Sequence, residues 1–139
     1  MSNVIFMVDI QGYKYNPGYE YSVKAWSNWS KKNGHEFVRL TEAIHDKDVM
    51  NPNWHKFFAF DLLENENIDV DKLLVVDADT IIHPDTPNFF EMTENKYCLV
   101  HDDGSYDWIL RGMEHYKKHI FHNDWFNFWE YGNSGFQIV

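Results

Sequence analysis

The chain has few basic side chains and a single cysteine, and each shortage excludes a class of protein. Its 139 residues carry 12 Lys and Arg against 22 Asp and Glu, which gives a net charge of −10. A chain this acidic repels polyanions, so we expect no nucleic acid and no anionic membrane surface as its partner. One cysteine, Cys98, cannot form an internal disulfide framework and is compatible with a reducing compartment.

Long apolar runs and targeting signals are also missing. The N-terminus has no basic segment, and the apolar run at residues 4–8 is too short for a signal sequence or a membrane span. The sequence contains no repeat, low-complexity tract or obvious linker. Its length suffices for one core, which 11 Phe, 8 Tyr and 6 Trp help to fill. We therefore expect a single cytoplasmic domain over residues 1–139, without a membrane span.

Short apolar runs alternate with helical patterns, which is the order of an open α/β sheet. A run without polar interruption is typical of a strand that is buried on both faces, as in a parallel sheet covered by helices. We predict a Rossmann-like open, mainly parallel sheet with helices on both faces. Its strands are expected at residues 4–8, 37–40, 73–76, 97–100 and 136–139, the last being either an edge strand or part of a larger fold.

Helical spacing marks the segments between these strands. Tyr19, Val23 and Trp26 recur at helical intervals, and Gly34 offers a left-handed stop after two lysines. Asn51, followed by a proline, is typical of the start of a second helix. A third helix is expected at residues 106–116. In the second helix, the stripe that we expect to face the core consists of Trp54, Phe57, Phe58 and Leu62.

Two carboxylates follow the central apolar run. In an extended chain residues i and i+2 point to the same side, so Asp77 and Asp79 share a face while Ala78 turns away. Their Cα atoms would lie about 6–7 Å apart. A hard divalent cation would relieve the repulsion between them, although a solvated strand exit would do so too. An acidic chain that binds a phosphate-bearing ligand needs such a cation.

Further polar residues have two interpretations each. Lys56 lies off the predicted stripe, where it is either a solvated lysine or one that reaches a phosphate. His115 and His119 lie four residues apart, with His122 beyond, and such a pair can bind zinc. The glutamate of a metalloprotease helix is missing between them, and surface histidines usually have no role. The aromatic residues between 125 and 131 are typical of a core, although exposed aromatic faces stack on sugars and bases.

Four segments together resemble one enzyme family. They are Val8-Asp9 with Tyr19 and Ser22 on the following helix, the Trp-x-Lys of residues 53–57, the Asp-x-Asp strand of residues 72–82, and Asn133-Ser134-Gly135-Phe136. In this order they resemble the nucleotide-sugar-binding half of a GT-A-type glycosyltransferase, closest to the glycogenin-like and galactosyltransferase-like branches. The resemblance implies a GT-A-like nucleotide-diphospho-sugar transferase fold, in a truncated or minimal donor-binding half.

The resemblance also implies a metal-dependent glycosyltransferase, of the hexosyltransferase type, that uses a UDP- or GDP-sugar. Asp77 and Asp79 would hold Mn²⁺ or Mg²⁺ against the diphosphate, and Lys56 would face the phosphates or the sugar. Asn133 would line the sugar pocket. No matched position fixes a general base, for which Asp102 or Asp103 is a candidate in a configuration-inverting reaction. The residues expected to contact the donor are Val8, Asp9, Ile10, Tyr13, Tyr15, Lys56, Asp77, Ala78 and Asp79.

The sequence departs from this family in that it stops before the acceptor-binding half, and this leaves alternatives open. Family members that retain the anomeric configuration supply a further metal-ligating histidine downstream, for which His101 or His122 would have to substitute here. The chain would then be either an enzyme or a nucleotide-sugar-binding domain without transfer activity, its acceptor half missing or supplied by a partner. The acceptor (a sugar, glycan or protein) and association into a homo-oligomer also stay open.

Haloacid-dehalogenase-like phosphatases share Asp-x-Asp, but they place Thr fourth after the first Asp, whereas Thr80 stands third.

Overall fold

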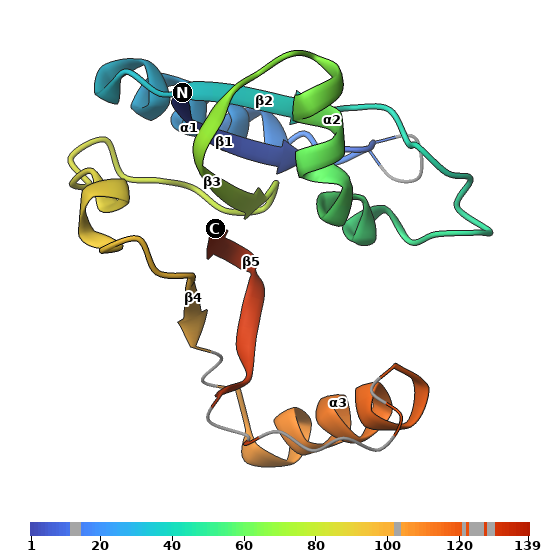
Figure 1. Cartoon of the computed structure of the whole chain (residues 1–139). Helices are drawn as coiled ribbons and strands as arrows, with labels where there is room; N and C mark the ends of the chain where they lie inside the picture. The colour runs from blue at the N-terminus through green and yellow to red at the C-terminus, as the bar shows by residue number, and fades with distance from the viewer. Residues whose placement is uncertain (12–14, 102–103, 121, 123–126, 128–129) are drawn as a thin grey trace.

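The computed structural model describes residues 1–11, 15–101, 104–120, 122, 127 and 130–139, which form an open five-stranded sheet with helices (Figure 1). Two of the helices, η1 and η2, are short 3-10 helices. The elements follow in the order β1 (Ser2–Val8), α1 (Tyr19–Asn33), β2 (Glu36–Leu40), η1 (Pro52–Phe58), α2 (Ala59–Asn65), β3 (Val70–Asp77), η2 (Phe89–Met92), β4 (Cys98–His101), α3 (Tyr106–His119) and β5 (Gly132–Ile138).

The sheet is mixed, with the strand order β2-β1-β3-β5-β4. β1 pairs in parallel with β2 and β3, whereas β5 runs antiparallel to both of its neighbours, β3 and β4. The prediction of a mainly parallel sheet is therefore wrong, because an apolar run indicates that a strand is buried but not in which direction it runs. β5 is also an interior strand, not an edge strand, since β2 and β4 form the two edges of this sheet.

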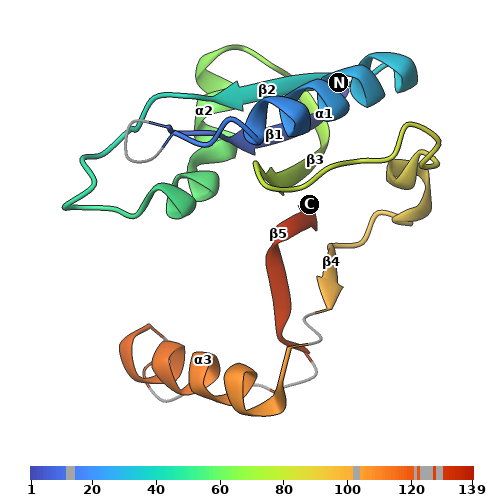
Figure 2. The same cartoon turned by 180° about the vertical axis from the view of Figure 1, so that it is seen from behind.

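Helices cover both faces of the sheet, as predicted. Successive strand residues point to opposite faces, so β1 and β3 contribute to two separate cores. On one face Ile5, Met7, Leu74 and Val76 pack with Trp26 and Trp29 of α1. On the other face Val4, Phe6, Leu73 and Val75 pack with Ala59 and Leu63 of α2. Figures 1 and 2 show α1 and α2 on these opposite sides of β1 and β3.

α1 ends where the sequence predicts and holds the segment that follows β3. Gly34 has a left-handed φ of 72°, and its N–H donates to the carbonyl of Lys31. On the buried side of the helix, Ser22 donates a hydrogen bond to the carbonyl of Thr80, and Trp26 Nε1 donates to Thr80 Oγ1 at 3.1 Å. These contacts fix the backbone immediately after Asp79.

The segment from η1 to α2 begins as predicted but buries a different stripe. The Asn51 side chain accepts a hydrogen bond from the Asn53 N–H at 3.0 Å and so caps η1. Trp54 and Phe57, however, are 44% and 64% exposed. A 3-10 turn has about three residues instead of 3.6, which rotates the side chains out of the α-helical phase assumed for the stripe. The buried residues are His55, Lys56, Ala59 and Leu63.

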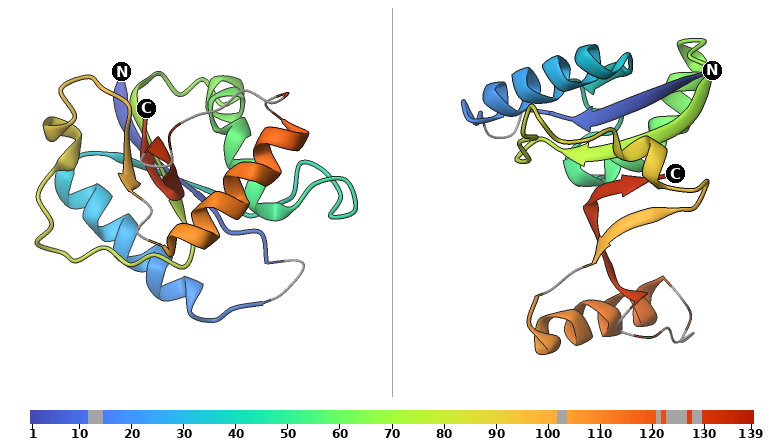
Figure 3. Two further views of the ribbon diagram at one scale, coloured as in Figure 1. Left: turned by 90° about the horizontal axis from the view of Figure 1, so that it is seen from below. Right: turned by 90° about the vertical axis from the view of Figure 1, so that its left-hand side faces the viewer.

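α3 lies at the opposite end of the molecule from α1, and β5 runs from beside it to β3 (Figures 1 and 3). The Ser105 side chain caps α3 by accepting a hydrogen bond from the Trp108 N–H at 3.3 Å. Ile109 and Met113 are its buried residues. None of the described helices combines the length and apolarity that crossing a membrane requires.

Candidate functional site

The three parallel strands end together, where open α/β sheets bind their ligands. Val8, near the end of β1, pairs with Leu40 of β2 and with Asp77 of β3. A cavity of about 220 Å³ opens at this edge, and we call it the strand-end cavity. Its lining contains several of the predicted donor contacts: it consists of Val8, Ile10, Tyr19, Pro52, Asn53, Asp77, Ala78 and Asp79.

Asp77 is held by a buried lysine. Lys56 Nζ lies 2.5 Å from Asp77 Oδ1, and it also donates to the carbonyl of Ser134 at 3.2 Å. The lysine side chain is 4% exposed and that of Asp77 is 36% exposed. Lys56 is not a solvated lysine, and its predicted place off the buried stripe is also wrong. Its side chain is buried, and its ammonium neutralises Asp77, the first carboxylate of Asp-x-Asp.

β5 approaches Asp77 closely on its other side. A Cβ on Gly135 would lie 2.6 Å from Asp77 Oδ2 and 2.9 Å from Asn133 Oδ1. Because these separations are shorter than ordinary contact, a side chain at this position would displace the carboxylate. The Gly135 N–H donates to Asn133 Oδ1 at 2.7 Å. Asn133, predicted to line the sugar pocket, thus lies two residues before Gly135, the strand position that faces Asp77, and is itself exposed.

Asp79 differs from Asp77 in being exposed. It has no hydrogen bond or ion pair with any residue that the structure describes, and it lines the strand-end cavity. The two carboxylates therefore border one cavity, with one neutralised by Lys56 and the other available to a ligand.

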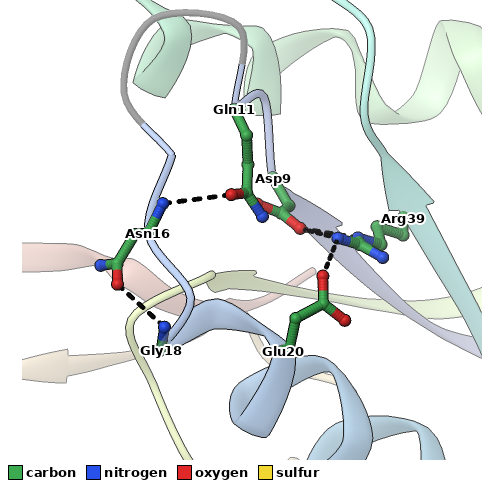
Figure 4. Close-up of polar contacts among 6 residues, drawn as sticks. All are labelled: Asp9, Gln11, Asn16, Gly18, Glu20 and Arg39. Atoms are coloured by element: carbon green, nitrogen blue, oxygen red, sulfur yellow. Dashed lines mark hydrogen bonds and ion pairs between the residues drawn. The ribbon is translucent and has the colours of Figure 1, made fainter.

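Asp9 stands in the chain between two residues that line this cavity, Val8 and Ile10, and its carboxylate contacts Arg39 (Figure 4). Its side chain is fully buried, and Oδ2 accepts hydrogen bonds from two nitrogens of Arg39. Oδ1 is buried without a hydrogen-bond partner in the described structure. Buried acceptors are nearly always satisfied, so an unsatisfied one indicates a ligand or water that completes it.

Arg39 stays charged beside Asp9. It also contacts Glu20 of α1 at 3.1 Å. Burial lowers the pKa of Arg39, but hydrogen bonds to Asp9 and Glu20 and the charges of these two carboxylates outweigh it, and the pKa rises. The guanidinium thus neutralises Asp9 while leaving its second oxygen without a hydrogen-bond partner.

The loop after β1 carries two of the residues predicted to contact the donor, Tyr13 and Tyr15. Tyr13 lies outside the described residues, and Tyr15 is 68% exposed and does not line the strand-end cavity. The ends of the loop are tied by local hydrogen bonds: the Asn16 N–H donates to Gln11 Oε1 at 3.2 Å, and the Gly18 N–H donates to Asn16 Oδ1 at 3.0 Å (Figure 4).

The remaining predicted residues do not complete a metal site in the described structure. Asp102 and Asp103, the candidate bases, lie outside the described residues, as does most of the aromatic run between 125 and 131. The rings of His115 and His119 lie 4.7 Å apart on α3. Within the described part of the chain, no three His, Cys, Asp or Glu side chains gather as a metal would require.

A second, larger hollow was missed by the sequence analysis, because Trp54 and Phe57 were assigned to the core. It measures about 620 Å³, and we call it the aromatic cleft. Trp54 and Phe57 of η1 line it together with Tyr116 and Ile120 from α3 and the segment after it. Asn53 and Asp77 line both the aromatic cleft and the strand-end cavity, so the two hollows meet at these residues.

Comparison with known structures identifies a similar fold. A crystal structure described as that of a glycosyltransferase involved in the glycosylation of the major capsid of PBCV-1 matches with a TM-score of 0.61 at 11% identity. The chain shares its fold with a glycosyltransferase. The match covers 99% of this chain and 59% of that one, so our chain spans little more than half of its length. No protein-family model and no curated protein sequence matches the chain.

Proposed function

We propose that the chain is a metal-dependent glycosyltransferase of the GT-A type that uses a nucleoside-diphosphate sugar. The observation that carries the proposal is the strand-end cavity, which two neighbouring carboxylates, Asp77 and Asp79, border at the carboxyl ends of parallel strands. The fold similarity to a glycosyltransferase supports the same conclusion. In a chain with a net charge of −10, a diphosphate needs a cation beside it.

The carboxylates of the strand-end cavity would supply some, but not all, of the ligands of Mn²⁺ or Mg²⁺. Asp79 is free to ligate, whereas Asp77 must share its carboxylate with Lys56. Two carboxylates are too few for a hard cation, which takes about six oxygen ligands and commonly draws the rest from substrate phosphates and water. The residues therefore suit a cation that binds together with the donor diphosphate.

Asp9 fits the base of such a donor. Its unsatisfied Oδ1 is an acceptor, so it would pair with a ring N–H or an amino group of the base. Ile10 and Tyr19 line the strand-end cavity and would pack against the ring. A base at this end would direct the diphosphate towards Asp77 and Asp79.

In the transfer itself, the bond between the anomeric carbon and the diphosphate oxygen breaks, and its electron pair leaves with the nucleoside diphosphate. The oxygen of an acceptor hydroxyl forms the new bond to that carbon, and the hydroxyl proton passes to a carboxylate or to water. A bound divalent cation stabilises the charge of the leaving diphosphate. Lys56, displaced from Asp77 when the cation takes this carboxylate, would add a second positive charge beside it.

A donor screen tests the proposal. UDP- and GDP-sugars are compared by thermal shift and then by calorimetry, with and without Mn²⁺, and release of the nucleoside diphosphate is followed with candidate acceptors. We expect one donor to bind in a Mn²⁺-dependent way and to be turned over. Binding without release would indicate a donor-binding domain without transfer activity. If no donor bound in the presence of Mn²⁺, the proposal would be rejected.

A further inference from the structure

Two large aromatic side chains of η1 face solvent. Trp54 is 44% exposed and Phe57 is 64% exposed, and their ring centroids lie 6.0 Å apart at an interplanar angle of 69°. The opposite side of the same short helix is buried through His55 and Lys56. An exposed patch of large apolar side chains is unfavourable in water and commonly marks a ligand groove.

The hollow that these rings line has the size of a small-molecule site. Its volume of about 620 Å³ falls within the roughly 300–1,000 Å³ of ligand pockets. Asn53, Glu130 and Ser134 add polar groups beside the Lys56–Asp77 ion pair, and most of the remaining lining is aromatic or aliphatic. Figure 3 (left) views the molecule from the side on which α3 lies, and α3 supplies Tyr116 to this cleft.

The aromatic cleft adjoins the strand-end cavity, since the two hollows share part of their walls. Asn53 and Asp77 line both hollows, and Lys56, which holds Asp77, lines the aromatic cleft. A molecule in the cleft therefore lies next to the carboxylates that we assign to the donor diphosphate. An acceptor that attacks a donor held by these carboxylates would have to lie next to them.

We propose that the aromatic cleft is the acceptor site and that it binds a neutral carbohydrate, with a sugar ring stacked on Trp54 or Phe57. The inference rests on the proposed glycosyltransferase function and names the substrate class of its second site. Sugar rings have an apolar C–H face that packs on an aromatic ring, while their hydroxyls bond to polar groups at the edge.

Charge favours a neutral acceptor over an anionic one. The described lining contains one cation, Lys56, which is already paired with Asp77, and it contains the carboxylate of Glu130. The Glu130 carboxylate accepts a hydrogen bond from the Asn127 N–H but has no ion pair among the described residues. An anionic acceptor would thus meet a negative charge that no cation balances, and the field of a chain with a net charge of −10.

The test uses saturation-transfer NMR with lactose, cellobiose, maltose and the methyl glycosides of glucose, galactose and mannose, in the presence of UDP or GDP and Mn²⁺. We expect at least one of these sugars to receive saturation from the wild-type protein. Its affinity should fall about tenfold or more in Trp54→Ala and in Phe57→Ala. Trp54→Phe keeps an aromatic face and should retain binding.

Phe60→Ala is the matched control, because Phe60 is an aromatic residue in the next turn that is 50% exposed and does not line the cleft. It should leave sugar binding unchanged. Circular dichroism confirms that each variant is folded. The proposal is overturned if none of the sugars binds, or if Trp54→Ala and Phe57→Ala both bind as well as the wild type.

Two further outcomes separate this inference from the proposed function. If Trp54→Ala weakened a nucleotide sugar more than the corresponding nucleoside diphosphate, the donor's own sugar would occupy the cleft and the acceptor assignment would fail. If sugars bound in a Trp54-dependent way but no nucleotide bound with Mn²⁺, the donor proposal would fail and, with it, the assignment of the cleft as an acceptor site.

Discussion

Lys56 Nζ lies 2.5 Å from Asp77 Oδ1, so a lysine already neutralises one of the carboxylates that we assign to a divalent cation. A cation that binds Asp77 must therefore share this carboxylate or displace the ammonium from it. In the second case the ammonium would be free to turn towards a diphosphate or sugar. The Lys56–Asp77 ion pair is therefore expected to compete with the metal and to change when metal and donor bind.

Replacing Lys56 with alanine should lower stability and strengthen the response to metal. It leaves the half-buried Asp77 without its partner, at a cost of about 1–3 kcal/mol, between the values for exposed and buried ion pairs. Mn²⁺ can then neutralise Asp77 without competition. We expect Mn²⁺ to raise the melting temperature of Lys56→Ala more than that of the wild type. An equal or smaller rise would show that the lysine and the cation do not compete.

Asp79 should matter for the donor but not for the fold. Because it is exposed and has no partner in the described structure, Asp79→Ala should change the free energy of unfolding by no more than about 0.5 kcal/mol. Calorimetry should show Mn²⁺-dependent donor affinity falling about tenfold or more. Asp71→Ala, at the opposite end of β3, is the matched control and should bind normally. Unchanged donor affinity in Asp79→Ala would reject the metal site.

Metal and nucleotide should bind cooperatively. Two carboxylates leave most of the ligand positions of Mn²⁺ to the diphosphate and water. Mn²⁺ alone should therefore bind weakly, and UDP or GDP should tighten it by about tenfold or more, with Mn²⁺ tightening the nucleotide by the same factor. Calorimetric titrations in both orders measure the coupling. Equal Mn²⁺ affinity with and without nucleotide would contradict a shared site.

Arg39 should be required for the stability of the fold, because it neutralises the charge of the buried Asp9. Arg39→Met removes the partner of a fully buried carboxylate, which should cost about 3–5 kcal/mol in the free energy of unfolding. The double variant with Asp9→Asn carries no charge there and should recover much of this loss. Urea unfolding of the single and double variants completes the cycle. If the double variant were no more stable than Arg39→Met, burial of the charge would not be the cause.

Gly135 should be needed for the position of the Asp77 carboxylate. Its missing side chain leaves room for Asp77 Oδ2, since a Cβ would lie 2.6 Å from that oxygen. Gly135→Ala should therefore displace the carboxylate and weaken Mn²⁺-dependent donor binding. Gly112→Ala, in α3, meets the Tyr131 hydroxyl at 3.0 Å, does not touch the strand-end cavity, and should bind the donor normally. Normal donor binding by Gly135→Ala would show that Asp77 need not hold its position.

Local signals predicted the elements well. The apolar runs at β1 and β3 correctly predicted buried strands, Asn51 the cap of η1, and Gly34 the end of α1. These features depend on residues that are close in sequence. The same is true of the placement of Asp77 at the end of a central strand. The extended backbone predicted through Asp79 is wrong, because β3 ends at Asp77 and Asp79 lies in the turn that follows. Their shared cavity with Val8 and Ile10 follows from parallel pairing of β1 and β3.

What the sequence analysis missed depends on residues far apart in the chain. The direction and place of β5 are set by its pairing with β3 and β4, which no local pattern encodes. The Lys56–Asp77 ion pair and the exposure of Trp54 both follow from the 3-10 turn of η1, whose side chains project with a different period from those of an α-helix. The aromatic cleft therefore became visible only in three dimensions.

The position of β5 inside the sheet also bears on how the chain is made. One edge of β3, with its backbone donors and acceptors, stays uncovered during synthesis until residues 132–138 have emerged and paired with it. An open strand edge of this kind invites pairing with a second nascent chain. The pairing of β5 also brings Gly135 and the Ser134 carbonyl to Asp77 and Lys56. One folding step therefore covers the open edge of β3 and completes the surroundings of the Asp77 carboxylate.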